Sequence, residues 1–184
     1  MSSEVFIRGR QILLRPFQTD DTILFCNGEN DPEIRETLFL AFPINVDRIR
    51  ERITAQVNSQ NAVILTIAEK TTGKAIGQTA FFRIDPISRS GIFYLALLDK
   101  SKWSRGLGTE ATRLMVEYGF NTLNLHRIQL HVFKDNKAAI RIYEKIGFKI
   151  EGTLREAMYH HGRYCDFLVM GCLKSEWQST ESSV

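Results

Sequence analysis

The sequence predicts an α/β (α+β) fold in which a mixed β-sheet is covered by helices. Some segments alternate apolar and polar residues, as Ile128–Phe133 does, which is typical of half-buried strands. Others repeat apolar residues every three or four positions, as amphipathic helices do; Ala111, Leu114, Met115 and Tyr118 form one such face. The segments run as one strand, two or three helices, three strands, a helix, a strand, a helix and two strands. This order favours a sheet of about seven strands with helices on its faces.

The N-terminal part predicts one strand and three helices. A side chain suited to capping precedes each helix: Asp20 or Thr19, then Asp31, then Asn45 or Asp47. Proline at the start of the second helix fits, because the first helical turn tolerates proline. The expected elements are a strand over 11–17 that stops near Pro16, a helix over 21–28, a helix from Asp31-Pro32-Glu33, and a helix over 46–58.

The remainder predicts strands interleaved with two helices. A turn at 71–74 joins the first two strands as a hairpin, and His161-Gly162-Arg163 joins the last two. Gly147 suits the end of the second helix, because glycine readily adopts the left-handed conformation found there. The expected elements are strands over 62–69, 75–84 and 91–98, a helix over 107–122, a strand over 128–133, a helix after Asp135-Asn136, and strands over 148–159 and 164–173.

Length and composition are those of one soluble globular domain spanning residues 1–184. The chain is 43% hydrophobic and 24% charged, which are ordinary values. We expect the folded core to span about 11–177 and the polar tail, 178–184, to be frayed. A net charge of +3 is too small to indicate nucleic-acid binding, and no direct nucleic-acid contact is expected.

The sequence also predicts a cytoplasmic protein without a membrane partner. No run approaches the ~18 apolar residues needed to span a bilayer, and the N-terminus lacks the pattern of a signal peptide. Cys26, Cys165 and Cys172 are odd in number and form no C-x-x-C pair, so we expect free thiols. The histidines lack metal-ligand spacing; the adjacent pair His160-His161 is expected on the surface, and no metal is expected.

A glycine-bearing turn, Trp103–Ala111, connects the apolar strand over 91–98 to an amphipathic helix. The first N–H groups of a helix lack internal partners, and that end of the helix dipole is positive. Gly106 and Gly108 allow the backbone to approach an anion, and Arg105 adds a full charge. The turn therefore predicts a phosphate-bearing cofactor, with a ligand-free turn as the alternative. Neither the P-loop string nor the dinucleotide fingerprint is present.

This turn resembles the acetyl-CoA signature of the GNAT superfamily of N-acetyltransferases, Gln/Arg-x-x-Gly-x-Gly/Ala. Trp103 stands where Gln or Arg is commonest, and Trp-x-[KR]-Gly-x-[GA]-Thr-Glu-Ala is similar to the ribosomal-protein N-acetyltransferase (RimJ/RimL type) branch. The resemblance implies the GNAT fold, a mixed and mostly antiparallel sheet with acetyl-CoA bound at the central strand–turn–helix. The implied cofactor contacts are Ala96, Leu97, Leu98, Trp103, Ser104, Arg105, Gly106, Leu107, Gly108 and Thr109.

A second segment, Asn136 to Phe148, is similar to the superfamily pattern N-x-x-A-x-x-[LI]-Y-x-[KR]-x-G-F. The resemblance implies that Asn136 and Ala139 contact the cofactor. It also implies that Tyr143 lies near the sulfur as a general acid, and a tyrosine is a reasonable proton donor to a departing thiolate. By spacing alone, Tyr143 could equally be a core aromatic residue and Asn136 a plain helix cap.

The general base is left open by the sequence. The strand over 91–98 carries no acidic residue, so the acid found there in many relatives is missing. His131 occupies a strand position where some ribosomal-type relatives carry a glutamate, and imidazole can accept an ammonium proton. The alternatives are a histidine satisfied within the sheet, or water acting as the base.

The acceptor side is expected to be an apolar lip over 38–44, with Phe39 and Phe42 contacting the substrate. Polyamine acetyltransferases are also similar to the chain over 105–175, but a polycation needs acidic groups around it. The acids preceding the lip are expected to be a solvated helix face; these are Glu29, Asp31, Glu33 and Glu36. The sequence therefore predicts a peptide N-terminus of the ribosomal-protein type as acceptor.

The sequence also allows two alternatives to this function. One is a small amine, such as a polyamine, an amino sugar or an antibiotic. The other is a non-catalytic CoA-binding or sensing module. In addition, the hairpin over 148–173 could pair edge to edge with a second copy, giving a homodimer.

Overall fold

The computed structural model describes residues 5–177, so the expected frayed tail, 178–184, lies outside the described residues. The elements in chain order are β1 (Ile7–Arg8), β2 (Ile12–Arg15), α1 (Asp21–Asn30), α2 (Pro32–Leu38), α3 (Val46–Val57), β3 (Val63–Glu69), β4 (Ala75–Asp85), β5 (Ser90–Leu97), the short 3-10 helix η1 (Lys100–Lys102), α4 (Leu107–Asn121), β6 (Arg127–Phe133), α5 (Lys137–Ile146), β7 (Lys149–His160) and β8 (Arg163–Leu173).

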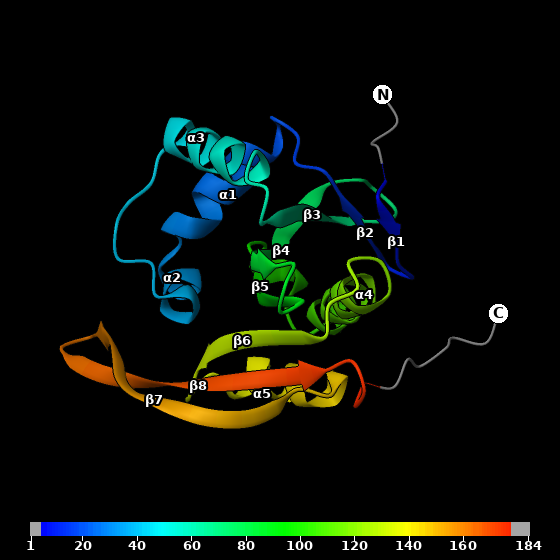
Figure 1. The fold of residues 1–184 in the computed structure, drawn as a ribbon. Helices are drawn as coiled ribbons and strands as arrows, with labels where there is room; N and C mark the ends of the chain where they lie inside the picture. The colour runs from blue at the N-terminus through cyan, green and yellow to red at the C-terminus, as the bar shows by residue number, and fades with distance from the viewer. Residues whose placement is uncertain (1–4, 178–184) are drawn as a thin grey trace.

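The strands form one mixed sheet in the order β1-β2-β3-β4-β5-β6-β8-β7 (Figure 1). Every neighbouring pair is antiparallel except β5 and β6, which run parallel. The sheet has one strand more than expected. The chain reverses at Gly9, whose N–H donates to the Ile12 carbonyl at 2.9 Å, and this turn adds the two-residue β1 beside β2. The predicted fold class is confirmed.

Helices cover both faces of the sheet. Figure 1 shows α1, α2 and α3 gathered on one side of the central strands and α4 on the other. On the first side, Phe25, Ile34 and Ile53 pack with Ala96 and Leu98 of the β5 end. On the second side, a larger cluster joins α4 and α5 to the sheet; it includes Phe81, Met115, Phe120, Ile128, Ile140 and Ile146. Burial of these side chains holds the strand–turn–helix in place.

The predicted helix starts are largely confirmed, with one correction. The Asp31 carboxylate caps α2 by accepting from the Glu33 and Ile34 N–H groups, and Asn45, not Asp47, caps α3. Asp20 makes no capping hydrogen bond at α1. Instead Asp21, inside the helix, accepts two hydrogen bonds of 2.7 Å from the buried Arg15 guanidinium. The buried positive charge on β2 decides which carboxylate organises this helix start, because a buried charge needs a partner.

The three cysteines are free thiols, as expected. Burial raises the pKa of the Cys172 thiol to about 11, which fits an unreactive core residue. None of the helices in residues 5–177 is both long and apolar enough to cross a bilayer.

Candidate active site

The central feature of the candidate site is a gap between the two parallel strands. β5 and β6 are paired only where Ser90–Ile92 lies beside Arg127–Gln129. Beyond this point both strands continue, and β5 stays paired to β4 as far as Leu97. The β5 edge facing β6 therefore has backbone groups that no strand satisfies, and such groups bind a ligand or water. A cavity of about 290 Å³ lies between the two strands.

The turn after β5 is built to leave the start of α4 open. Gly106, with φ of 79°, is the residue before the helix, and it offers no capping side chain to the first N–H groups. Gly108 is enclosed: an added Cβ would lie 3.4 Å from Ile142 Cδ1 and 3.6 Å from Leu95 Cδ2. Arg105 is exposed beside the turn. Free N–H groups, the helix dipole and a nearby guanidinium together suit a pyrophosphate.

The contacts of Trp103 account for a tryptophan at the position where Gln or Arg is commoner. Its indole Nε1–H donates to the Leu97 carbonyl at 3.1 Å, so it fastens the turn to the end of β5. Trp103, Ala96 and Leu97 line the cavity. Leu98 does not: its N–H donates to the Ile76 carbonyl, and its side chain packs against Gly28. Leu98 therefore lies outside the cavity lining, as do the turn residues over 104–109.

Tyr143 lies between the apolar core and the cavity. Its ring packs edge-on against Phe93 and Phe148, and 8% of the residue is exposed. It is therefore partly the core aromatic that spacing alone suggested, yet it also lines the cavity. Burial raises its pKa to about 12, because a phenolate is poorly solvated there. At neutral pH the hydroxyl is protonated and can donate a hydrogen bond to a departing thiolate.

Asn136 and Ala139 stand at the start of α5, at the rim of the same cavity. The Asn136 carboxamide oxygen accepts from the Ala139 N–H at 3.0 Å, so the residue is a helix cap. Its amide N–H₂ group is not used by that bond and is available at the cavity rim. Capping and cofactor contact are therefore compatible in this geometry.

His131 also lines the cavity, from β6. It is exposed, and its Nε2 lies 3.2 Å from Gln129 Nε2. Side chains alternate along a strand, so His131 shares a face with Phe133, which packs against Phe39 next to α2. His131 therefore faces the side of the sheet that carries α1, α2 and α3, opposite to the side where α4 begins.

The expected acceptor lip forms one wall of a larger groove of about 1050 Å³. Phe39, with φ of 55°, ends α2 and packs against Phe133, Phe167 and His160. It lines both the groove and the cavity of Tyr143, so the two spaces adjoin there. Phe42 is 82% exposed in the groove wall. The two predicted substrate residues are thus brought to one groove.

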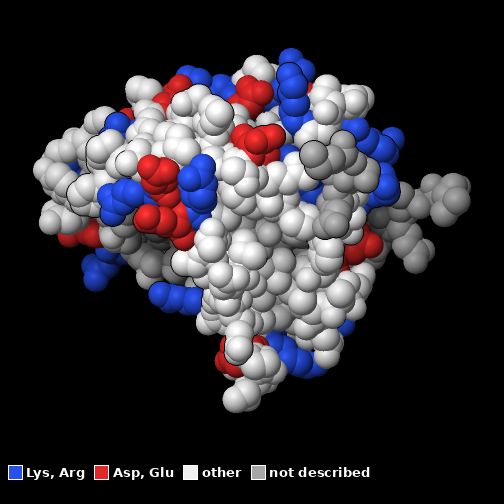
Figure 2. Space-filling view, turned by 90° about the horizontal axis from the view of Figure 1, so that it is seen from above, with Lys and Arg blue, Asp and Glu red and all other residues white. Residues whose placement is uncertain are grey.

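Charge in the groove is balanced rather than acidic. Glu29 is 4% exposed, and the Arg52 guanidinium binds both of its carboxylate oxygens. Glu51 and Arg48 line the same groove, which gives two acids and two bases. On the face shown in Figure 2, acidic side chains are likewise flanked by basic ones.

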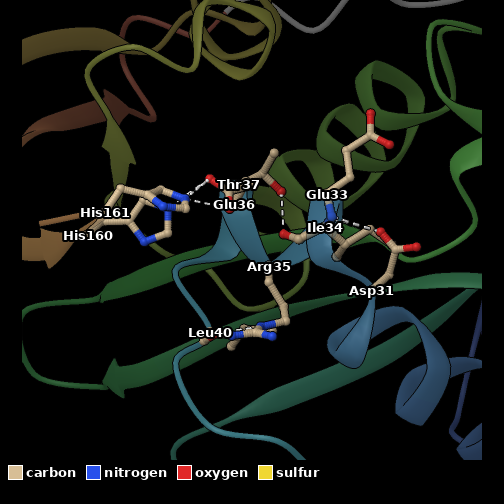
Figure 3. Close-up of polar contacts among 9 residues, drawn as sticks. All are labelled: Asp31, Glu33, Ile34, Arg35, Glu36, Thr37, Leu40, His160 and His161. Atoms are coloured by element: carbon tan, nitrogen blue, oxygen red, sulfur yellow. Dashed lines mark hydrogen bonds and ion pairs between the residues drawn. The ribbon is translucent and has the colours of Figure 1, made fainter.

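The other acids before the lip do not line this groove. Glu33 and Asp31 both pair with Lys100, and Glu36 contacts the histidines of the hairpin tip (Figure 3). Asp31, Glu33 and Glu36 are therefore paired at the surface, outside the acceptor groove. Only Glu29, which is buried and paired, reaches the groove.

Three polar residues near the site, Tyr94, Gln78 and Arg52, were not predicted from the sequence. Tyr94 lines both the cavity and a small pocket of about 180 Å³ that it shares with Glu29 and Gln78. Burial, followed by the charge on Glu29, raises the pKa of Tyr94 well above its usual range. Gln78 is 4% exposed, and its side-chain oxygen has no hydrogen-bond partner among the described residues. Tyr94 could have been noticed, because it is a polar residue two positions before the predicted cofactor contact Ala96. Nothing in the local sequence marks Gln78 or Arg52 as part of the site.

Comparison with known proteins agrees with this geometry. The family description "Acetyltransferase (GNAT) domain" matches residues 11–149. The chain is 29% identical over 172 residues to the "Uncharacterized N-acetyltransferase p20" of Bacillus licheniformis, covering 91% of this chain and 95% of that protein. It is 29% identical over 167 residues to the spermidine N(1)-acetyltransferase of Vibrio cholerae, covering 91% and 95%.

A solved structure gives the same result. The crystal structure of spermidine N-acetyltransferase from Vibrio cholerae in complex with CoA and spermine superposes with a TM-score of 0.82 at 28% identity. The match covers 90% of this chain and 97% of that one. The chain therefore belongs to the GNAT family of N-acetyltransferases.

Proposed function

We propose that this protein transfers an acetyl group from acetyl-CoA to the primary amine of a small molecule. The observation that carries the proposal is the cavity between β5 and β6, which holds Tyr143 at one side and adjoins the acceptor groove at Phe39. Relatives named spermidine N-acetyltransferases, aligned over nearly their whole length, favour a small amine over the peptide N-terminus expected from the sequence.

The residues present fit acetyl-CoA. The open N–H groups at the start of α4 and the Arg105 guanidinium suit the pyrophosphate. The unpaired β5 edge suits the amide groups of the pantetheine arm, as a strand edge binds an extended chain. Asn136 and Ala139 would contact that arm from the rim. These assignments retain the predicted set, with Leu98 removed.

The chemistry asks little of the protein beyond positioning. Acetyl-CoA supplies a thioester that is already activated toward an amine. Tyr143 donates a proton or hydrogen bond where negative charge develops on the leaving sulfur. His131, or water held beside it, takes the proton released by the amine. None of the three cysteines lines the Tyr143 cavity, which supports direct transfer without an acyl-cysteine.

The groove favours an amine that carries one positive charge and an apolar body. Its wall is formed by the apolar lip, from Phe39 to Ile44, with Met158. Its two carboxylates are matched by Arg48 and Arg52, so a second or third ammonium group would gain little Coulomb energy there. We therefore propose a monoamine acceptor, in contrast to the polyamine named for the relatives.

Release of free CoA from acetyl-CoA against a panel of acceptors tests this proposal. The panel contains arylalkylamines, spermidine, amino sugars and peptides with ribosomal-protein N-termini. We expect kcat/KM to be highest for an arylalkylamine. The acceptor assignment fails if a peptide or spermidine is the best substrate. The enzymatic assignment fails if no amine is acetylated while acetyl-CoA binds.

A further inference from the structure

Three side chains with metal-binding atoms meet where α2 approaches the tip of the β7–β8 hairpin (Figure 3). His160 Nε2 lies 2.9 Å from Glu36 Oε2, and His161 Nε2 lies 2.7 Å from each oxygen of the same carboxylate. Glu36 comes from α2, whereas the histidines are 124 and 125 residues later in the chain. The three ligand atoms lie within 4.8 Å of one another.

The local backbone explains how two consecutive histidines can face one point. Neighbouring side chains on a strand point to opposite faces. Here β7 ends at His160, and His161 and Gly162 form the turn with φ of 49° and 76°. Positive φ at both turn residues is typical of a tight hairpin, and it redirects the second imidazole toward the first. The ring centroids are 4.1 Å apart.

Packing holds the carboxylate opposite the imidazoles. Phe39, at the end of α2, packs against the His160 ring at 4.5 Å and against Phe133 and Phe167. The last turn of α2, which carries Glu36, is thereby seated on the hairpin. A cavity of about 470 Å³ adjoins the three residues and leaves room for water.

We propose that Glu36, His160 and His161 bind a divalent transition-metal ion of the zinc or cobalt kind. Two imidazoles and one carboxylate form a ligand set that zinc uses when a fourth position stays open to water. Imidazole ligation favours zinc, cobalt or nickel over magnesium and calcium. Metal–nitrogen bonds of about 2.0–2.1 Å place tetrahedral ligand atoms roughly 3.3 Å apart. The two imidazole–carboxylate separations, 2.9 and 2.7 Å, are shorter than this by about half an ångström, and all three ligand atoms lie within 4.8 Å of one another.

This site differs from the sequence expectation of no metal. An adjacent histidine pair has no recognised ligand spacing, and the third ligand is supplied by a distant helix. None of the three residues lines the cavity that holds Tyr143, although the cavity beside them shares Phe133 and Asn136 with it. It would connect α2 to the hairpin beside the acceptor groove, which Phe39 and Met158 help to form.

Metal binding to tag-free protein, stripped with a chelator and desalted, tests this site. Zn²⁺ stoichiometry is measured by equilibrium dialysis, and Co²⁺ coordination by visible absorption. We expect one equivalent of either ion, an absorption spectrum of tetrahedral type for Co²⁺, and no comparable binding of Mg²⁺. Zn²⁺ should also raise the thermal midpoint, because it binds the folded state alone.

Matched variants distinguish the site from scattered surface histidines. His161→Asn tolerates the left-handed turn, and Glu36→Gln keeps the shape of the side chain; each should weaken Zn²⁺ binding about tenfold or more. His126→Asn removes another exposed histidine, and Glu33→Gln removes another exposed acid of α2; both should bind Zn²⁺ as the wild type does. The proposal is overturned if the wild type binds no stoichiometric Zn²⁺, or if the two ligand variants bind no more weakly than the two controls.

Discussion

Tyr143→Phe is the most informative substitution, because it removes one oxygen and keeps the ring. The ring packs against Phe93 and Phe148, so the variant should fold and bind acetyl-CoA normally. Loss of a general acid typically costs 10²–10⁴-fold in rate, or about 3–5 kcal/mol of transition-state stabilisation. We expect kcat to fall by this factor while the KM for acetyl-CoA changes little.

Steady-state CoA release, with acetyl-CoA affinity measured separately, gives the comparison. Tyr118→Phe is the matched control, since Tyr118 lies on α4, packs against Phe6 and does not line the cavity. The assigned role of Tyr143 is refuted if Tyr143→Phe retains kcat within about threefold of the wild type.

The same residue makes a prediction about stability at high pH. Its folded pKa of about 12 exceeds the ordinary value of 10.0, so the unfolded chain loses this proton first. The stabilisation is complete below pH 10 and is lost as the pH rises toward 12. By linkage, Tyr143 alone lowers the free energy of unfolding by about 1.4 kcal/mol between pH 9 and pH 11. In denaturant unfolding, the free energy of unfolding of Tyr143→Phe should decrease between pH 9 and pH 11 by about 1.4 kcal/mol less than that of the wild type. An identical decrease in both proteins would contradict a raised pKa for Tyr143.

The remaining predictions concern cofactor, base, acceptor and core. Arg105→Gln should raise the KM for acetyl-CoA roughly tenfold with kcat unchanged, and the effect should shrink at high salt. His131→Gln should lower kcat about tenfold or more; an unchanged kcat would leave water as the base. Arg48→Glu should raise kcat/KM for spermidine relative to a monoamine by roughly tenfold, since it changes the groove charge by two units; an unchanged ratio would exclude charge as the selector. Arg15→Met leaves the buried Asp21 carboxylate without its ion-pair partner and should lower the free energy of unfolding by about 3–5 kcal/mol. An unchanged free energy of unfolding would show that the pair does not stabilise the fold.

Local sequence was enough to predict features formed by nearby residues. The glycine turn, the amphipathic face of α4 and the Asn136 and Gly147 ends of α5 all depend on residues within a few positions. Their physical causes, helix periodicity and the left-handed conformation of glycine, act at that range. Because these causes are local, most element boundaries could be predicted from the sequence. The order of the predicted elements then indicated the fold class.

Features formed by distant residues were not predictable in this way. The pairing of β5 with β6 stops after Ile92, although the apolar run of β5 continues unchanged to Leu97. The Glu29–Arg52 pair joins two helices, and each of its residues alone resembles a solvated helix surface. The sequence favours Asp20 or Thr19 at the first helix start, whereas buried Arg15 pairs with Asp21. Tertiary packing decides each of these cases.

A crystal structure with CoA bound would locate the cofactor relative to the gap between β5 and β6. We expect the pyrophosphate within hydrogen-bonding distance of the N–H groups at 107–109. We also expect the pantetheine arm between β5 and β6, with the thiol facing the Tyr143 hydroxyl. CoA bound elsewhere, or a pantetheine arm outside the gap between the two strands, would rule out the proposed cofactor site.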